Sequence, residues 1–112
     1  MQVDTVEHTV QMAVIAPKES VDAFTGERLK AHLNEMLDKG ITRLVIDLSD
    51  VPFLDSAGLA VLVTALKRSR QAGGDVRLVW PAAESARRII HLTKFHQIFS
   101  ISDTAVDALN SF

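Results

Sequence analysis

An aspartate and a serine, Asp55 and Ser56, stand between a strand-like run and a helix-like run of the sequence. The run before them, residues 44–48, is mostly aliphatic, and apolar residues after them recur at i, i+3, i+4 and i+7. This order places the serine hydroxyl at the N-terminal end of a helix, beside a carboxylate and past the carboxyl end of a strand. Small α/β proteins present their chemistry at that edge, where a helix N-terminus also favours anions. Ser56 could therefore attack a substrate, bind a partner or be modified itself.

Spacing alone favours a structural role for Ser56. It is predicted as the N-cap of its helix, with the side-chain oxygen accepting a hydrogen bond from the N–H of Gly58 or Leu59, worth roughly 1 kcal/mol. A nucleophilic role is rejected, because Leu54 occupies the position of the first glycine in the G-x-S-x-G elbow of hydrolases. The sequence also places no histidine to act as the base for Ser56. We therefore predict no catalytic residue and no enzymatic activity.

Metal and cofactor sites are not predicted either. The four histidines are scattered, and His91 and His96 are five residues apart, which does not place them on one helix face. The absence of cysteine excludes disulfides and thiolate ligands. Gly73 and Gly74 follow a helix and precede a strand, which is the reverse of a phosphate-binding loop.

A cluster of cations, Lys67, Arg68 and Arg70, lies in the last turns of the helix that begins near Ser56. Its simplest interpretation is a solvated helix end, where the helix dipole favours positive charge. Binding of a polyanion is the alternative, but no aromatic residues alternate with these cations to stack on bases. The net charge of −2 gives no further reason to expect nucleic acid as a direct partner.

The composition indicates one compact domain over residues 1–112. The 47% of apolar and 23% of charged residues are typical of ordinary globular proteins. Apolar runs are of strand length, short of the roughly 18 residues of a membrane-spanning helix, so no membrane insertion is expected. The N-terminal residues lack the basic and apolar regions of a signal peptide. Together with the lack of cysteine, these features favour a cytoplasmic location.

The chain order predicts a mixed α/β sheet of four to five strands with about four helices, mostly on one side. Alternation at Val10, Met12 and Val14 indicates an N-terminal β-hairpin with a turn near His8 and Thr9. The later elements are predicted as a helix at about 22–39 ended by Gly40, a strand at 41–48, a helix from Ser56 to Gly73, a strand at 76–80, a helix at 83–91, a short strand near 98–101 and a final helix capped by Ser102 and Asp103.

A second candidate segment begins the first predicted helix. Asp22 is expected to cap this helix and Phe24 to act as an apolar staple, which is the simplest interpretation of the spacing. The loop that leaves the second strand could lie beside the loop before the Ser56 helix. In that case Asp22, Thr25 and Ser56 would share one surface.

Several segments of the chain together carry a family pattern. They are Val21-Asp22-Ala23-Phe24-Thr25 leading into Leu29 and Lys30, Leu54–Leu59, Gln71–Val79 and Arg88–Leu92. With these segments the chain closely resembles the bacterial anti-sigma-factor antagonists, which are single-domain STAS proteins. The resemblance runs from about Val3 to Val106 and implies the STAS fold.

The resemblance further implies a phosphorylation switch at Ser56. The expected kinase is an anti-sigma factor that is also an ATP-dependent serine kinase. The unphosphorylated protein would bind it and free the sigma factor, phosphorylation would end the binding, and a PP2C-type phosphatase would reset the switch. No cofactor is implied. The expected contact residues are Asp22, Phe24, Thr25, Asp55, Ser56, Ala57, Gly58 and Leu59.

Three positions depart from the family pattern. Glu19 replaces a glycine three residues before Asp22, Ala57 replaces a hydroxyl residue that many members carry after the serine, and Lys94 stands where glycine is common. None of these changes removes the phosphate acceptor.

Two other functions remain open. Residues 55–60 also fit the D-[ST]-A-G-L-A segment of STAS subunits in lipid-transport ATP-binding-cassette complexes, although the longer C-terminal part favours the antagonist type. The chain could also be a STAS switch in a different kinase and phosphatase network. A nucleotide-hydrolysing enzyme is the least supported, because no phosphate loop or catalytic dyad is present.

Overall fold

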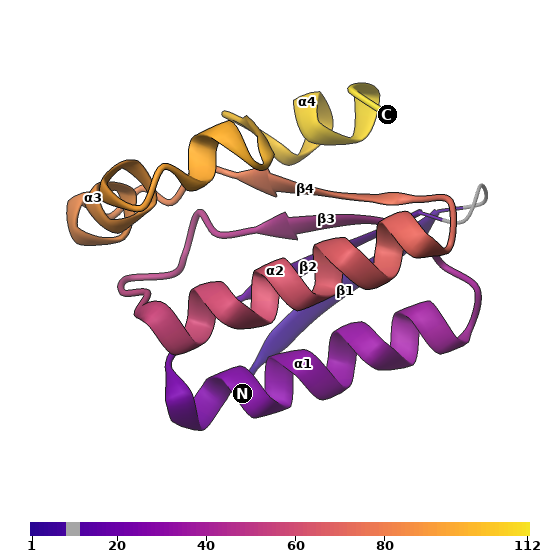
Figure 1. Ribbon diagram of the computed structural model, residues 1–112, viewed down its shortest axis with the longest axis horizontal. Helices are drawn as coiled ribbons and strands as arrows, with labels where there is room; N and C mark the ends of the chain where they lie inside the picture. Colours follow the sequence, from indigo (N-terminus) through magenta and orange to yellow (C-terminus); the bar gives the residue numbers. More distant parts are fainter. Residues whose placement is uncertain (9–11) are drawn as a thin grey trace.

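The computed structural model describes residues 1–8 and 12–112 and shows, over these residues, a five-stranded sheet flanked by helices (Figure 1). The strands are β1 Val3–His8, β2 Met12–Pro17, β3 Arg43–Asp47, β4 Asp75–Val79 and β5 Ser100–Ser102. The helices are α1 Ala23–Asp38, α2 Ser56–Gln71, α3 Glu84–Leu92 and α4 Ala105–Asn110, with a short 3₁₀ helix, η1, at Phe95–Gln97.

The sheet is mixed, as predicted, and its strands follow one another in sequence order from β1 to β5. β1 pairs antiparallel with β2, with Val3 opposite Pro17. The other three pairings are parallel, for example Ile46 of β3 beside Leu78 of β4. The predicted N-terminal hairpin is therefore confirmed, while Thr9 and Val10 of its proposed turn and strand lie outside the described residues. Because β2, β3 and β4 are parallel, the loops at their carboxyl ends meet at one edge of the sheet.

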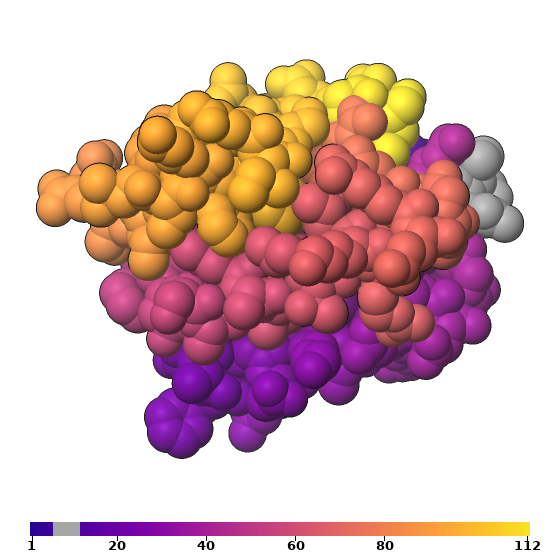
Figure 2. All heavy atoms as spheres, viewed as in Figure 1, coloured from indigo at the N-terminus to yellow at the C-terminus, as the bar shows by residue number. Residues whose placement is uncertain are grey.

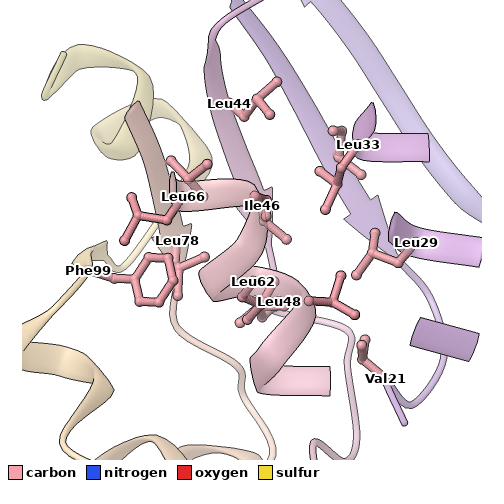
Figure 3. Close-up of a cluster of buried hydrophobic side chains, with 14 of the residues drawn as sticks. Val21, Leu29, Leu33, Leu44, Ile46, Leu48, Leu62, Leu66, Leu78 and Phe99 are labelled. Carbon is pink, nitrogen blue, oxygen red and sulfur yellow. The ribbon is translucent and has the colours of Figure 1, made fainter. Parts of the chain in front are cut away.

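The main hydrophobic core lies between the sheet and the pair α1 and α2 (Figure 3). Polar and apolar residues alternate little in β3 because this strand is buried on both faces. Leu44 and Ile46 of β3 point into the main core. Complete burial of such a side chain stabilises the fold by roughly 1.5–3 kcal/mol. The fully buried residues that fill this core include Ile15, Val21, Leu29, Leu33, Leu48, Leu54, Leu62 and Leu78.

The opposite face of the sheet is covered by α4. Val45 of β3 and Val79 of β4 pack there against Ala108 in a second, smaller cluster. The prediction of helices mostly on one side holds for α1 and α2 but not for α4. The predicted cap of α4 is also wrong, because Thr104 is the N-cap and its Oγ1 accepts a hydrogen bond from the Asp107 N–H at 3.1 Å.

The face of the molecule formed by helices carries three neighbouring bands. In Figure 2, α1, α2 and the segment of α3 and η1 lie side by side as purple, pink and orange surfaces. Within residues 1–8 and 12–112, none of the helices has the length and apolar character needed to cross a membrane. The first turns of α1 and α2, at one end of these bands, hold the candidate site.

Candidate functional site

A short backbone bridge joins the loop before α1 to the loop before α2. Val21 and Leu54 form an isolated parallel bridge. The Val21 N–H donates to the carbonyl of Phe53 at 3.0 Å, and the Asp55 N–H donates to the carbonyl of Val21 at 3.4 Å. The bridge places the start of α1 beside the start of α2. The predicted neighbourhood of the Asp22 and Ser56 segments is therefore confirmed.

Gly58 permits this close approach of the two loops. A Cβ at position 58 would lie only 2.3 Å from the carbonyl oxygen of Val21, which no real side chain tolerates. Gly58 is buried, and the neighbouring Leu59 is 3% exposed. Of the contact residues that the sequence predicts, Gly58 therefore lies beneath the surface, and Leu59 is reached only from the groove described below.

An ion pair also joins the segments that precede α1 and α2. The ammonium of Lys18, after β2, lies 2.8 Å from a carboxylate oxygen of Asp50, which precedes α2, and 3.4 Å from that of Asp4. The hydrogen bond to Asp50 is the main cause that raises the pKa of Lys18 above its usual value. Sequence patterns did not indicate this contact, because its partners are 32 residues apart.

Asp22 caps α1, as predicted, and forms a complete capping box with Thr25. Its Oδ1 accepts hydrogen bonds from the N–H of Thr25 at 3.0 Å and of Phe24 at 2.9 Å, and the Asp22 N–H donates to Thr25 Oγ1 at 3.0 Å. The hydrogen bonds that the carboxylate accepts lower the pKa of Asp22, and the bond from the Thr25 N–H is the largest cause. Asp22 is therefore a fixed negative charge at the start of α1.

The predicted cap of α2 is wrong: Asp55, not Ser56, is the N-cap. The Asp55 backbone is extended, and its Oδ1 accepts a hydrogen bond from the Gly58 N–H at 2.9 Å. The Asp55 carboxylate thereby lies at the positive end of the α2 dipole, which favours its negative charge. Ser56 becomes the first residue of α2, with an exposed side chain that forms no hydrogen bond within the described part of the chain.

Two exposed phenylalanines flank the Val21–Leu54 bridge. Phe24 is 88% exposed in the first turn of α1, so its predicted role as an apolar staple is wrong. Phe53, directly before Leu54, is 48% exposed. Sequence reasoning missed Phe53, although an aromatic residue in the short loop before Asp55 was a usable signal. We call the exposed and half-buried residues Asp22, Phe24, Phe53, Asp55, Ser56 and Ala57 the Ser56 surface.

A groove of about 410 Å³ extends from Ser56 along α2. Its walls are mostly apolar and come from α2 and from the segment between α3 and η1. The lining residues are Ser56, Leu59, Ala60, Val63, Thr64, Thr93 and Phe95. The sequence did not reveal this groove, because its two walls are about 30 residues apart along the chain and meet only in the folded protein.

The segment after α3 also corrects the prediction of scattered histidines. Lys94 has φ 59°, in the left-handed region, and reverses the chain after α3. His96 thereby comes to lie against His91, with ring centroids 5.0 Å apart, and His91 stacks on Trp80 at the same centroid distance. The two histidines do not share a helix face, yet they are neighbours. Residues 1–8 and 12–112 contain no group of three or more His, Cys, Asp or Glu that could hold a metal ion.

Comparison with known proteins places this chain among close relatives in sequence. A model of the STAS domain matches residues 2–108. A Thermotoga maritima protein, whose name assigns it provisionally to the anti-sigma factor antagonists, is 38% identical over 76 residues. That match covers 68% of this chain and 66% of the relative, so the chain spans just under two thirds of the relative's length. The anti-sigma-F factor antagonist RsfB of Mycobacterium tuberculosis is 35% identical over 99 residues, which are 88% of this chain and 79% of RsfB.

Solved structures agree with these relatives. The crystal structure of an anti-sigma factor antagonist from Mycobacterium paratuberculosis superimposes with a TM-score of 0.83 at 29% identity, over 98% of this chain and 93% of that one. SpoIIAA in its unphosphorylated form superimposes with a TM-score of 0.82 at 15% identity, over 98% and 95% of the two chains. At that identity SpoIIAA shows the shared fold alone.

Proposed function

The chain belongs to the STAS domain family, and we propose that it is an anti-sigma factor antagonist controlled by phosphorylation of Ser56. The observation that carries this proposal is the exposed hydroxyl of Ser56 at the start of α2, which forms no hydrogen bond with any residue that the structure describes. In this proposal residues 1–112 form one STAS domain that acts in the cytoplasm by binding, without catalysis and without a cofactor. Its partners are an anti-sigma factor that is also a serine kinase and a PP2C-type phosphatase, and it does not contact nucleic acid directly.

The geometry suits Ser56 as a phosphate acceptor. Because Asp55 performs the capping, the Ser56 hydroxyl is available to a kinase without disrupting α2. The backbone N–H groups of Ser56 and Ala57 form no hydrogen bond within the described residues, whereas those of Gly58 and Leu59 are bonded to Asp55. A phosphate on Ser56 would meet this free end of the helix, which favours an anion by roughly 0.3–1 kcal/mol. The modified protein is therefore expected to stay folded.

The same phosphate would prevent partner binding by its charge. It would add about −1.5 to −2 charges beside the carboxylate of Asp55. A partner surface that fits a neutral hydroxyl would have to desolvate this charge, at a cost of several kcal/mol. Since each 1.4 kcal/mol is about a factor of ten in affinity, phosphorylation would weaken the complex by orders of magnitude. The switch thus acts on the interface rather than on the fold.

Apolar features around Ser56 supply the affinity of the unphosphorylated form. Phe24 and Phe53 expose aromatic rings, and phenylalanine is enriched in the cores of protein–protein interfaces. The groove along α2 begins at Ser56 and can take an apolar side chain of the anti-sigma factor. A phosphate on Ser56 would lie at the mouth of this groove. The partner would then have to remove water from the phosphate in order to bind, which costs free energy.

Labelling of the intact protein tests this proposal. The protein is incubated with ATP and the serine-kinase anti-sigma factors of its own organism, and the modified peptide is mapped by mass spectrometry. Ser56→Ala should abolish labelling and keep binding, while Ser56→Asp should weaken binding by about tenfold or more.

Ser85→Ala is the control, because Ser85 is also exposed in the first turn of a helix, while its hydroxyl, unlike that of Ser56, donates to the carbonyl of Pro52 at 3.0 Å. This variant should be labelled like the natural protein. Continued labelling of Ser56→Ala would refute the assignment of the acceptor.

A further inference from the structure

The end of the molecule opposite Ser56 carries a pocket of about 330 Å³ with a strongly basic lining. Arg43 and Asp75 begin β3 and β4, and Arg70 lies in the last turn of α2. Ser56, in contrast, is the first residue of α2, and a helix of 16 residues is about 24 Å long. Figure 1 shows the two ends of α2 at opposite ends of the molecule. The pocket is therefore separate from the Ser56 surface. Its lining residues are Arg43, Arg70, Gly73, Gly74, Asp75, Arg77 and Phe112.

The carboxylate of Asp75 accepts a hydrogen bond from the Nε of two of the three arginines. The Nε of Arg70 lies 3.1 Å from its Oδ1, and the Nε of Arg77 lies 3.3 Å from its Oδ2. The terminal amino groups of Arg70 form no hydrogen bond or ion pair with any residue in ranges 1–8 and 12–112. Because a guanidinium has five N–H donors, the bond from Nε to Asp75 leaves four donors of Arg70 for a ligand.

Arg77 is held more firmly than Arg70. Its side chain is 19% exposed, and its guanidinium lies 4.5 Å above the ring centroid of Phe112. Nη1 of Arg77 donates to the carbonyl and to Oγ of Ser111. Nη2 has no partner within the described residues, so it can also serve a ligand.

The charges of the pocket do not balance. Among the side chains that line the pocket, three guanidinium groups face one carboxylate, so the side-chain charge is positive at neutral pH. Arg43 is exposed and forms no hydrogen bond or ion pair within the part of the chain that the structure describes. Such preorganised, fork-shaped donors match the oxygen atoms of a phosphate group in charge and in geometry.

We propose that this arginine pocket binds a phosphate group, either as the free anion or as a phosphate ester. The cations of this pocket are not the cluster of Lys67, Arg68 and Arg70 that the sequence indicated. Arg68, two residues before Arg70 in the sequence, pairs instead with Asp38 and Asn34 of α1. Arg70 is joined instead by Arg43 and Arg77, which come from two neighbouring strands. The inference does not depend on the proposed role of Ser56.

A titration followed by NMR tests the pocket in the full chain. Inorganic phosphate and pyrophosphate are added at constant ionic strength against chloride, and the backbone amide signals and the arginine Nε–H signals are recorded. Saturable shifts are expected at the pocket residues. A parallel titration with ADP, which carries the same number of phosphate groups as pyrophosphate, distinguishes the sources: tighter binding than pyrophosphate supports an ester, and equal or weaker binding supports recognition of the phosphate groups alone.

Variants decide whether the arginines are responsible. Arg43→Gln and Arg70→Gln should each weaken pyrophosphate binding by about fivefold or more, because each removes a charged donor. Arg68→Gln is the matched control and should bind like the natural protein, and so should Ser56→Ala. Thermal melting shows that each variant is folded. The proposal is overturned if no saturable shift appears at the pocket, or if Arg68→Gln weakens binding as much as Arg70→Gln.

Discussion

Replacement of Gly58 by alanine should destabilise the protein, because the new Cβ would lie 2.3 Å from the carbonyl oxygen of Val21. The atom in the way belongs to the backbone and cannot rotate aside, so the two loops would have to separate. Overpacking of this kind costs about 1–3 kcal/mol, and a rigid obstacle puts Gly58→Ala near the upper end. The better helix propensity of alanine offsets up to about 1 kcal/mol. We expect a net loss of about 2 kcal/mol.

Gly26→Ala provides a matched control for this substitution. Gly26 is also a buried helical glycine, but a Cβ there would lie 3.4 Å from a methyl group of Val61, which can yield slightly. The same gain in helix propensity should leave Gly26→Ala between unchanged and about 1 kcal/mol more stable.

Thermal and urea unfolding measure both variants. For a chain of 112 residues, 1 kcal/mol corresponds to about 4 °C in Tm, so Gly58→Ala should melt about 8 °C lower. Binding to the proposed anti-sigma factor partner should also weaken, because the Val21–Leu54 bridge that aligns the two loops would be strained. A Gly58→Ala variant as stable as the natural protein, or a Gly26→Ala variant equally destabilised, would refute the close approach of the loops.

Three further substitutions test other parts of the structure. Lys94→Gly should raise the Tm by a few degrees, because a left-handed residue with a Cβ costs about 1–2 kcal/mol, whereas Lys94→Ala keeps this strain and should not. Asp22 has a lowered pKa in the folded state, so its stabilising effect is present above its unfolded pKa of 3.8 and is lost as the pH falls through the folded value. Urea unfolding as a function of pH should therefore show a smaller acid loss for Asp22→Asn, and an equal loss would argue against the capping box. Ala60→Glu, in the groove, should weaken binding of the anti-sigma factor by about tenfold or more without lowering the Tm, and unchanged affinity in a pull-down titration would exclude the groove from the interface.

The sequence alone predicted most of the secondary structure, because the signals for it are local. The spacing of apolar residues predicted α1 and α2. Their ends were also predicted: Gly40 follows α1 and Gly73 follows α2, with φ of 85° and 86°. The Asp22 cap was also predicted from its neighbours. These features depend on residues within one or two turns of each other.

The cap of α2 shows where local reasoning fails. Asp55 and Ser56 are adjacent and both are good capping residues, so sequence does not say which one takes the extended backbone of an N-cap. That choice depends on the Val21–Leu54 bridge, which fixes the path of the chain into α2. The result matters for function, because it frees the Ser56 hydroxyl.

Sequence by itself thus determined the order of the elements, the mixed sheet and the segment that holds the candidate acceptor. Tertiary structure alone decided what surrounds that acceptor: the groove along α2, the exposed Phe53, the contact between His91 and His96, and the pocket of Arg43, Arg70 and Arg77. Helix and strand periodicity follow from backbone geometry that repeats every few residues. Grooves and charge clusters arise where segments distant in the chain pack together, and no local pattern records that packing.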